Sequence, residues 1–237
     1  MAKKPMEHGE NVKVIYEKSR WRLFTELRQK AIRIMEALDR VYLHAIVYGS
    51  IARGDVSEES DIDIFLPDQP SSFLVETALE RLGIQVHRRK VVQATPFYAV
   101  KGYIELEEQR CLSFPLVKLR QVERDFYTFS GEADLRILKE GRRVAGIDKR
   151  LMLIEPCFEG HVETAIVGRE GAIARLLGVS VHVVRERIRA LLRRNEVGRT
   201  GVFVEKELAP NESFELVLKR LSDRNPAVRR RIQFSEK

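Results

Sequence analysis

From about Val12 to Arg40 the apolar residues recur at steps of three to five, with charged residues between them. This spacing predicts an amphipathic helix with one buried face. The residues expected on that face are Trp21, Phe24, Leu27, Ile32, Met35 and Leu38. Residues 41–48 are rich in β-branched and aromatic side chains, which predicts a strand after the helix.

Residues 61–119 continue with short apolar runs separated by polar turns. A strand is expected at residues 61–66, and Ser71 or Ser72 is expected to cap a helix that ends at Gly83. Three more strands are expected, at residues 84–92, 97–107 and 111–119. This order of helices and strands predicts an α+β fold with helices packed on a small mixed sheet.

The C-terminal half predicts short strands at residues 135–144 and 151–167, followed by two helices. The first helix covers residues 169–177. After a tight turn at Gly178, Ser180 caps a second helix that runs to about Arg194. A small residue and a glycine at this spacing are typical of a helix-turn-helix. Residues 196–205, with Gly198 to Gly201 at the tip, are expected to form a hairpin that serves as a wing.

These patterns divide the chain into four consecutive segments. We expect a catalytic α+β domain, a connector with short strands, a winged helix-turn-helix domain, and a C-terminal helix with a basic tail at Arg229 to Arg231. Their expected bounds are residues 12–130, 131–160, 161–210 and 211–237.

The composition restricts the setting and the partners of the protein. With 237 residues, 44% of them hydrophobic, the chain can bury one large core or two smaller ones. The net charge of +7 fits a phosphate-rich partner. The two cysteines are too far apart in sequence for a zinc motif or a disulfide framework, so a reducing compartment is expected. No apolar run reaches about 18 residues, and we expect a cytoplasmic protein without a membrane segment.

The candidate chemistry centres on a Gly-Ser pair and two aspartates. An apolar run ends at Gly49-Ser50, and Asp61 and Asp63 follow on the next predicted strand. Because side chains alternate along a strand, both aspartates point to the same face. Two adjacent carboxylates predict a hard divalent cation. The alternative is a solvated turn with ordinary surface acids.

This stretch resembles the nucleotidyltransferase superfamily, which has the DNA polymerase β-like fold. That family carries Gly-Ser, a spacer of about ten residues and then Asp-x-Asp, as do Gly49-Ser50 and Asp61-Ile62-Asp63. Residues 49–54 are also similar to the Gly-Ser-x-Ala-Arg-Gly of small bacterial and archaeal members. The whole chain resembles predicted archaeal nucleotidyltransferases that join this domain to a helix-turn-helix.

The resemblance implies an NTP as substrate and two Mg²⁺ ions held by Asp61 and Asp63. Gly49 has no Cβ, so the backbone can approach a triphosphate closely. The Ser50 hydroxyl and nearby amides can donate to phosphate oxygens. Arg53 is expected to neutralise phosphate charge.

The family usually adds a third carboxylate on a neighbouring strand. Glu105 and Glu107 share one face of the predicted strand, and Glu105 is preferred because it lies mid-strand. A different register compares residues 95–98 and 112–115 with archaeal CCA-adding enzymes. In that register Ser113 takes the place of the third acid, and no competent third carboxylate is present.

The second predicted helix of the helix-turn-helix is strongly basic. In a DNA groove its arginines would contact phosphates, and Arg199 and Thr200 of the wing would contact the minor groove or the backbone. We therefore expect residues 169–201 to bind DNA or RNA. The basic residues of this helix are His182, Arg185, Arg187, Arg189, Arg193 and Arg194. The alternative is that the helices only pack against the catalytic domain.

The aromatic residues 126–129 are interpreted either as a base-stacking site or, preferably, as part of a core.

The leading hypothesis for the whole chain is an Mg²⁺-dependent nucleotidyltransferase. It would move a nucleoside monophosphate from an NTP to an acceptor hydroxyl on a nucleic acid. The alternative is a DNA-binding regulator whose nucleotidyltransferase domain senses a nucleotide or is inactive. A third possibility is a protein or small-molecule acceptor.

Overall fold

The computed structural model describes residues 11–107, 109–198 and 201–234. Its elements form two compact units, and each unit is assembled from three separate stretches of chain. The first unit comprises residues 1–30, 47–60 and 121–200, and the second comprises 31–46, 61–120 and 201–237. The units therefore alternate along the chain, which differs from the consecutive segments expected from the sequence.

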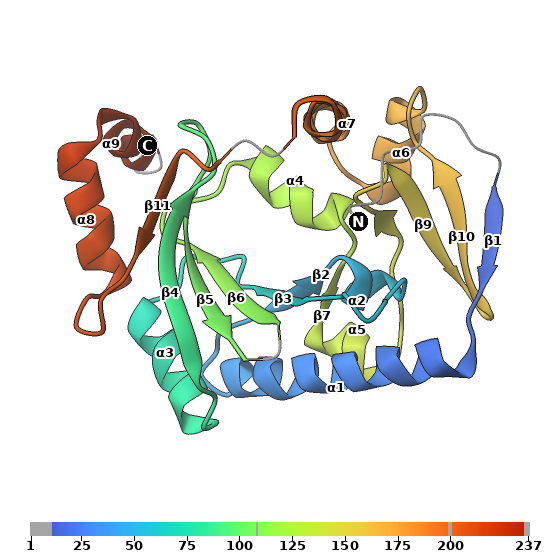
Figure 1. Ribbon diagram of the computed structural model, residues 1–237, viewed down its shortest axis with the longest axis horizontal. Coiled ribbons are helices and arrows are strands. Elements are labelled where there is room, and N and C mark those ends of the chain that lie inside the picture. Colours follow the sequence, from blue (N-terminus) through green and yellow to red (C-terminus); the bar gives the residue numbers. More distant parts are fainter. Residues whose placement is uncertain (1–10, 108, 199–200, 235–237) are drawn as a thin grey trace. The chain divides into compact units, whose positions relative to one another are not determined.

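The first unit contains a four-stranded antiparallel sheet with the strand order β1-β10-β9-β8. Figure 1 shows β1, β10 and β9 side by side. Its strands are β1 (Val12–Ile15), β8 (Gly146–Ile147), β9 (Met152–Cys157) and β10 (Gly160–Ala165). The predicted short strands at residues 151–167 are confirmed as β9 and β10. The predicted helical start at Val12 is wrong, because the β-branched residues of β1 pair with β10 and the helix begins only at Lys18.

Besides the short α2 (Ser50–Arg53), four described helices lie within the first unit, which also contains the N-terminal part of α1 (Lys18–Asp39). The helices are α4 (Gln121–Phe129), α5 (Leu135–Lys139), α6 (Glu170–Leu177) and α7 (Val181–Val197). The predicted strand at residues 135–144 is wrong, because Asp134 caps α5 by accepting from the Ile137 amide at 2.7 Å. Local capping overrides the strand tendency at this point.

The apolar faces of α4, α6 and α7 meet in one core that includes Phe129, Ile173, Val184 and Ile188. The two predicted helices around Gly178 are present. Gly178 has a φ of 67°, and the following amide closes the turn on the Ala174 carbonyl at 3.0 Å. The left-handed backbone explains the glycine at this position.

The predicted wing is wrong. Residues 196 and 197 continue α7, and Gly198 ends the helix by donating its amide to the Arg194 carbonyl at 3.0 Å. β11 (Val204–Glu207) does not fold back on this segment but pairs antiparallel with β4 (Val86–Gln93) of the second unit. Arg199 and Thr200 lie outside the described residues. Because β4 lies more than 100 residues before β11 in the chain, the local sequence around β11 could not predict this pairing.

The second unit contains the strands β11-β4-β5-β6-β3 in that order, with β3 parallel to β6 and the other pairs antiparallel. The remaining strands are β3 (Ile62–Phe65), β5 (Val100–Leu106) and β6 (Arg110–Pro115). Ser71 occupies the N-cap position of α3 (Ser72–Arg81) without a side-chain capping hydrogen bond, and the helix lies close to the predicted bounds. Helices with a mixed sheet confirm the α+β class.

The strand predicted at residues 41–48 is shorter in the structure and covers only β2 (Ile46–Tyr48), where the chain passes into the first unit.

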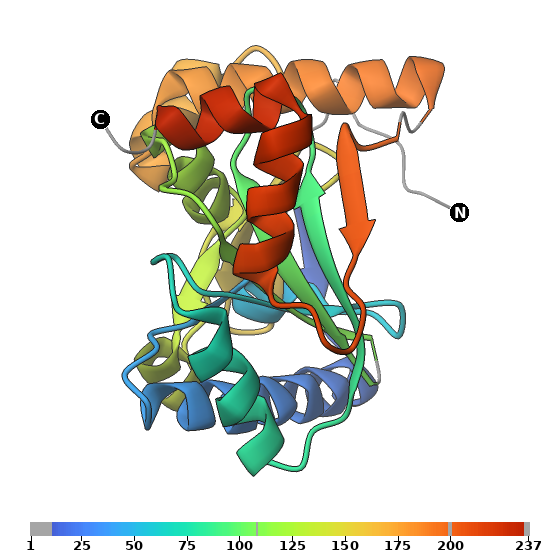
Figure 2. The same cartoon turned by 90° about the vertical axis from the view of Figure 1, so that its left-hand side faces the viewer.

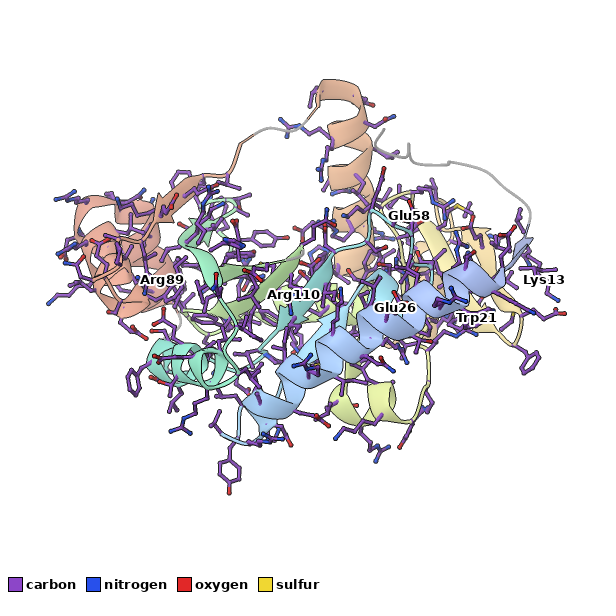
Figure 3. All side chains as sticks on the ribbon, turned by 60° about the horizontal axis from the view of Figure 1, so that its bottom comes forward. Lys13, Trp21, Glu26, Glu58, Arg89 and Arg110 are labelled. Atoms are coloured by element: carbon purple, nitrogen blue, oxygen red, sulfur yellow. The ribbon has the colours of Figure 1, made fainter. Side chains whose placement is uncertain are left out.

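Two C-terminal helices, α8 (Phe214–Arg224) and α9 (Pro226–Gln233), belong to the second unit and meet at an angle (Figure 2). The buried Phe214 ring lies 5.0 Å from the Phe114 ring. A Cβ at Gly102 would come within 2.7 Å of Phe114, so glycine permits this packing. Arg89, labelled in Figure 3, donates to Glu76 of α3 and to the carbonyls of residues 209, 210 and 212, which precede α8.

The basic tail is not fully solvated. Arg231 is 5% exposed, and its guanidinium donates to the Lys118 carbonyl at 2.8 Å. Asn225 caps α9 by accepting from the Ala227 amide at 3.0 Å. The run Arg229 to Arg231 therefore forms part of a folded helix, and only Arg229 and Arg230 are exposed.

Candidate functional site

Gly49 turns the end of β2 into α2 (Ser50–Arg53), and its backbone explains why glycine is needed. Its φ of 79° and ψ of −144° lie in a region that residues with a Cβ rarely adopt. The Gly49 amide donates to the Gly131 carbonyl at 2.9 Å, while its own carbonyl accepts from the amides of Ala52 and Arg53. A Cβ at Gly49 would lie in ordinary van der Waals contact with Arg53 Nη1 at 3.9 Å, so the backbone angles, and not a lack of space, explain the glycine.

Ser50 is half-buried, and its hydroxyl is tied to the loop that leads to the aspartates. It donates to Ser60 Oγ at 3.2 Å, and Ser60 Oγ accepts from the Ser57 amide at 2.9 Å. Ser60 directly precedes Asp61 in the chain. The Gly-Ser turn and the start of the Asp-x-Asp segment are thus linked through two serine hydroxyls.

Arg53 is buried and 5% exposed, and the structure gives it a structural role. Its guanidinium donates to Asp55 Oδ1 at 3.0 Å and to Oδ2 at 2.9 Å, and also to the carbonyls of Ser130 at 2.6 Å and Ile147 at 3.3 Å. Burial acts to raise the pKa of Asp55, but the charge and hydrogen bonds of Arg53 outweigh it and hold that pKa below its usual value. The expected contact of Arg53 with phosphate would require breaking these bonds.

Arg28 supports the Gly-Ser turn from α1, which sequence reasoning missed. It is 4% exposed and donates to the carbonyls of Ile51 at 3.1 Å and Ala52 at 3.2 Å. Burial, with the nearby positive charge of Arg143, lowers the pKa of Arg28 to about 10. The guanidinium also lies 4.5 Å from the Phe24 ring, one turn earlier on the helix face predicted to be buried. In the sequence, the position of Arg28 on the otherwise apolar face of the predicted helix could have indicated that this arginine has a buried partner.

The acidic residues lie on the polar face of the sheet in the second unit. Asp63 on β3 is the partner of Cys111 on β6, and Cys111 is also the partner of Glu105 on β5. Strand partners point to the same face, so Asp63, Cys111 and Glu105 form one row across three strands. Asp61, two residues before Asp63, shares this face and is exposed. Ile62 points to the other face and is 1% exposed, which agrees with the predicted alternation.

Cys111 is partly exposed and occupies the centre of this row. Burial raises the pKa of its thiol to about 12, and the negative charges of Asp63, Glu105 and Asp61 contribute to the shift. Burial, with smaller contributions from Cys111 and Asp63, likewise raises the pKa of Tyr103 to about 12. A neutral thiol therefore separates the carboxylates near neutral pH.

Glu105 is paired with basic residues of β4, on the side away from Cys111. Lys90 Nζ lies 2.7 Å from Glu105 Oε1 and 3.4 Å from Glu205 Oε1 of β11, while Arg88 lies 3.8 Å from Glu105. The hydrogen bond that Lys90 donates to the Glu105 carboxylate raises the pKa of Lys90. Within the described ranges, no group of three or more His, Cys, Asp and Glu residues is arranged to hold a metal ion.

The other candidate acid, Glu107, and Ser113, which takes the place of the third acid in the alternative register, are not strand partners in this row. Glu107 follows the end of β5, and its backbone carbonyl accepts from Arg110 Nε at 2.8 Å. Ser113 is 4% exposed and is the partner of Phe65 and Tyr103, not of Asp63. The structure therefore brings Glu105 into the row with Asp63, with a thiol between them.

The basic residues of α7 divide between its exposed side and the core. Arg185, Arg189 and Arg193 are exposed, and the first two line a surface pocket with His182. Arg187 instead turns inward, with its guanidinium 4.8 Å from the Phe126 ring, and burial lowers its pKa. Arg187 therefore packs α7 against α4 and does not belong to the exposed basic surface.

The aromatic residues of α4 belong to the core, as the preferred interpretation held. Tyr127 and Phe129 are each 2% exposed, and the Tyr127 ring lies 5.0 Å from the Tyr48 ring at the end of β2. Phe126 lies under Arg187. These rings position the strand that leads into the Gly-Ser turn, and none of them is presented for base stacking.

Comparison with known proteins identifies one domain. Residues 28–144 match the family model of the nucleotidyltransferase domain, and this segment includes Gly49, Ser50, Asp61, Asp63 and Glu105. No curated protein and no solved structure matches the chain. Of the helices that the structure describes, none has the length and apolar character needed to cross a membrane.

Proposed function

We propose that the chain is an Mg²⁺-dependent enzyme that transfers a nucleoside monophosphate from an NTP to a hydroxyl of a nucleic acid. A nucleotidyltransferase domain at residues 28–144 indicates nucleotide transfer from an NTP. The proposed Mg²⁺ dependence rests on one observation: Asp61, Asp63 and Glu105 lie on the same face of the sheet within that segment.

The donor set fits a hard divalent cation. Asp61 and Asp63 supply carboxylate oxygens, which Mg²⁺ prefers, and at least one of them is exposed to solvent. Glu105 would join them as the third carboxylate by giving up its contact with Lys90. Two Mg²⁺ ions bound there would neutralise the triphosphate and stabilise the attacking and leaving oxygens.

In this proposal Gly49 and Ser50 bind the triphosphate of the NTP. Because Gly49 has no Cβ, a phosphate could approach its backbone closely. The Ser50 hydroxyl would exchange its bond to Ser60 for a bond to a phosphate oxygen. Arg53 would act indirectly, because its bonds to Asp55 and to two backbone carbonyls hold the loop in place.

The exposed side of α7 supports a nucleic acid as the acceptor. Arg185, Arg189 and Arg193 follow one another at helical spacing, and the chain carries a net charge of +7. Such a surface would contact phosphates of DNA or RNA without reading their sequence. We therefore keep residues 169–201 as the proposed DNA- or RNA-binding region, although it contains no wing.

A second candidate is a DNA-binding regulator whose nucleotidyltransferase domain senses a nucleotide or is inactive. Two observations favour it: Glu105 is paired with Lys90, and the strand position directly across from Asp63 is a cysteine. A nucleotide could then bind without being transferred.

Incubation with NTPs labelled at the α-phosphate tests the first proposal, because that phosphate stays with the transferred group. In the presence of Mg²⁺ and a pool of RNA and DNA acceptors, the wild type should label an acceptor. The double variant Asp61→Ala/Asp63→Ala should not. Asp68→Ala is the matched control, since Asp68 is an exposed acid five residues after Asp63. Mg²⁺-dependent NTP binding without labelling of any acceptor would favour the regulator.

A further inference from the structure

A tight loop between β4 and β5 is held in shape by one buried glutamine. Gln93 is fully buried, and its side-chain nitrogen donates to the carbonyls of Pro96 at 3.2 Å and Tyr98 at 3.0 Å. The Tyr98 amide closes the turn on the Thr95 carbonyl at 3.1 Å. The side-chain oxygen of Gln93 is buried without a hydrogen-bond partner among the described residues, which costs folding free energy. A fixed loop obtained at the expense of stability indicates a role other than stability.

This loop and the segment beside it present two aromatic side chains to solvent. Phe97 is 75% exposed, so its ring contributes little to the core. Phe203 is also exposed, and its amide donates to the carbonyl of Ala94, at the start of the loop, at 3.1 Å. The segment is brought there by β11, which lies beside β4 (Figure 1) and has Val204 as the partner of Gln93. Two exposed rings therefore flank one rigid loop.

Positive charges lie next to these rings in the same unit. The end of β6 reaches the loop, because the Leu116 amide donates to the Val100 carbonyl at 2.9 Å. Two basic residues of the following segment, Lys118 and Arg120, are exposed. The Arg120 guanidinium lies 5.7 Å from the ring of Tyr98, the residue after Phe97. Aromatic and basic side chains are thus interleaved around the loop.

We propose that this platform, made of Phe97, Phe203, Lys118 and Arg120, binds the unpaired bases of a single-stranded nucleic acid. The inference rests on the proposed function, because it states which form of nucleic acid is the acceptor. Aromatic rings stack on unpaired bases of any sequence, and basic side chains bind the phosphates between those bases. A purely apolar partner would leave the flanking positive charges without a counterpart.

The platform distinguishes a single strand from a duplex. In a duplex the faces of the bases are covered by their neighbours in the stack, so Phe97 and Phe203 would find no base to contact. The exposed arginines of α7 differ in this respect, since phosphates are present in both forms of nucleic acid. The platform therefore supplies the preference for single strands, and the charges supply affinity for either form.

Binding of a labelled single-stranded oligonucleotide to the full-length chain, measured by fluorescence anisotropy without NTP, tests the proposal. Phe97→Ala should weaken binding about tenfold, which is the effect of losing one base–aromatic stack. The slope of log K against log salt should stay unchanged, because the variant removes no charge. Phe97→Trp should bind at least as tightly as the wild type. Phe73→Ala is the matched control and should have no effect, since Phe73 is 71% exposed on α3 of the same unit.

Two further ligands separate base stacking from other contacts. A duplex of the same sequence and a single strand that lacks bases should each bind the wild type and Phe97→Ala with equal affinity. The proposal is overturned if Phe97→Ala binds the single strand as tightly as the wild type does, or if it loses affinity for the base-free strand to the same extent. It is also overturned if the wild type binds no single strand. Circular dichroism of each variant shows that weaker binding does not reflect unfolding.

The outcome is independent of nucleotide transfer. A preference for single strands that depends on Phe97, without a labelled acceptor in the NTP experiment, would keep the platform and refute the enzyme. Transfer that depends on Asp61 and Asp63, with equal single-strand affinity in the wild type and Phe97→Ala, would keep the enzyme and refute the platform.

Discussion

The guanidinium of Arg53 donates hydrogen bonds to both carboxylate oxygens of Asp55, at 3.0 and 2.9 Å, immediately after the Gly-Ser turn. The pair is largely buried, with side-chain exposures of 6% and 13%. The same guanidinium also donates to the carbonyls of Ser130 and Ile147. One arginine therefore ties the end of α2 to two segments that lie far along the chain.

Arg53→Ala should destabilise the protein because it leaves the Asp55 carboxylate buried without its partner. We expect a loss of about 3–5 kcal/mol in the free energy of unfolding, measured by urea denaturation. Arg136→Ala, which removes an exposed arginine of the same unit, should change it by less than about 0.5 kcal/mol. A stable Arg53→Ala protein that has lost only NTP binding would instead assign Arg53 to the phosphates.

The stabilising effect of Asp55 should depend on pH in a defined direction. Its pKa in the folded state lies below its usual value, which is about 3.9 in an unfolded chain. The ionised carboxylate therefore stabilises the fold above about pH 4, and this contribution is lost as the pH falls through the folded-state pKa. The stability difference between wild type and Asp55→Asn should be large at pH 7 and shrink below about pH 4. A difference that is constant from pH 7 to pH 3 would contradict the ion pair.

Lys90 competes with any cation for Glu105. Replacing it by Gln should remove the nearer of the two basic partners of Glu105 and raise the affinity for Mg²⁺ or Mn²⁺ several-fold, on the order of 1 kcal/mol. Isothermal titration of the cation with and without NTP measures this change. Lys206→Gln removes the same charge from β11 but on the opposite face of the sheet, and should have a smaller effect. Equal effects of the two variants would show that only long-range charge matters.

The exposed arginines of α7 should govern nucleic-acid affinity and its salt dependence. The triple variant Arg185→Gln/Arg189→Gln/Arg193→Gln should weaken binding to DNA or RNA. The slope of log K against log salt should fall by about 1 for each phosphate that the variant no longer neutralises. Arg136→Gln/Lys139→Gln/Arg142→Gln removes the same charge from exposed positions on α5 and just after it, and is the control. An unchanged slope in the α7 variant would place the nucleic acid elsewhere or exclude it.

Arg28 and Cys111 illustrate what could not be predicted from the sequence. Arg28 lies on the face of α1 that the spacing predicts to be buried, but its function depends on the carbonyls of Ile51 and Ala52, more than twenty residues away. No motif surrounds Cys111, so its sequence context indicates only an apolar residue. Its position between two carboxylates follows from the registers of β3, β5 and β6, which only folding establishes.

The sequence alone determined the features whose cause is local. Gly49 is required by a positive φ, Asp61 and Asp63 share a face through strand alternation, and Gly178 ends a helix in the left-handed region. The tertiary structure alone decided which distant segments meet. It paired β11 with β4 in place of a wing and placed Cys111 across from Asp63. Backbone preferences act over a few residues, whereas strand pairing and buried ion pairs are selected by the packing of the whole chain.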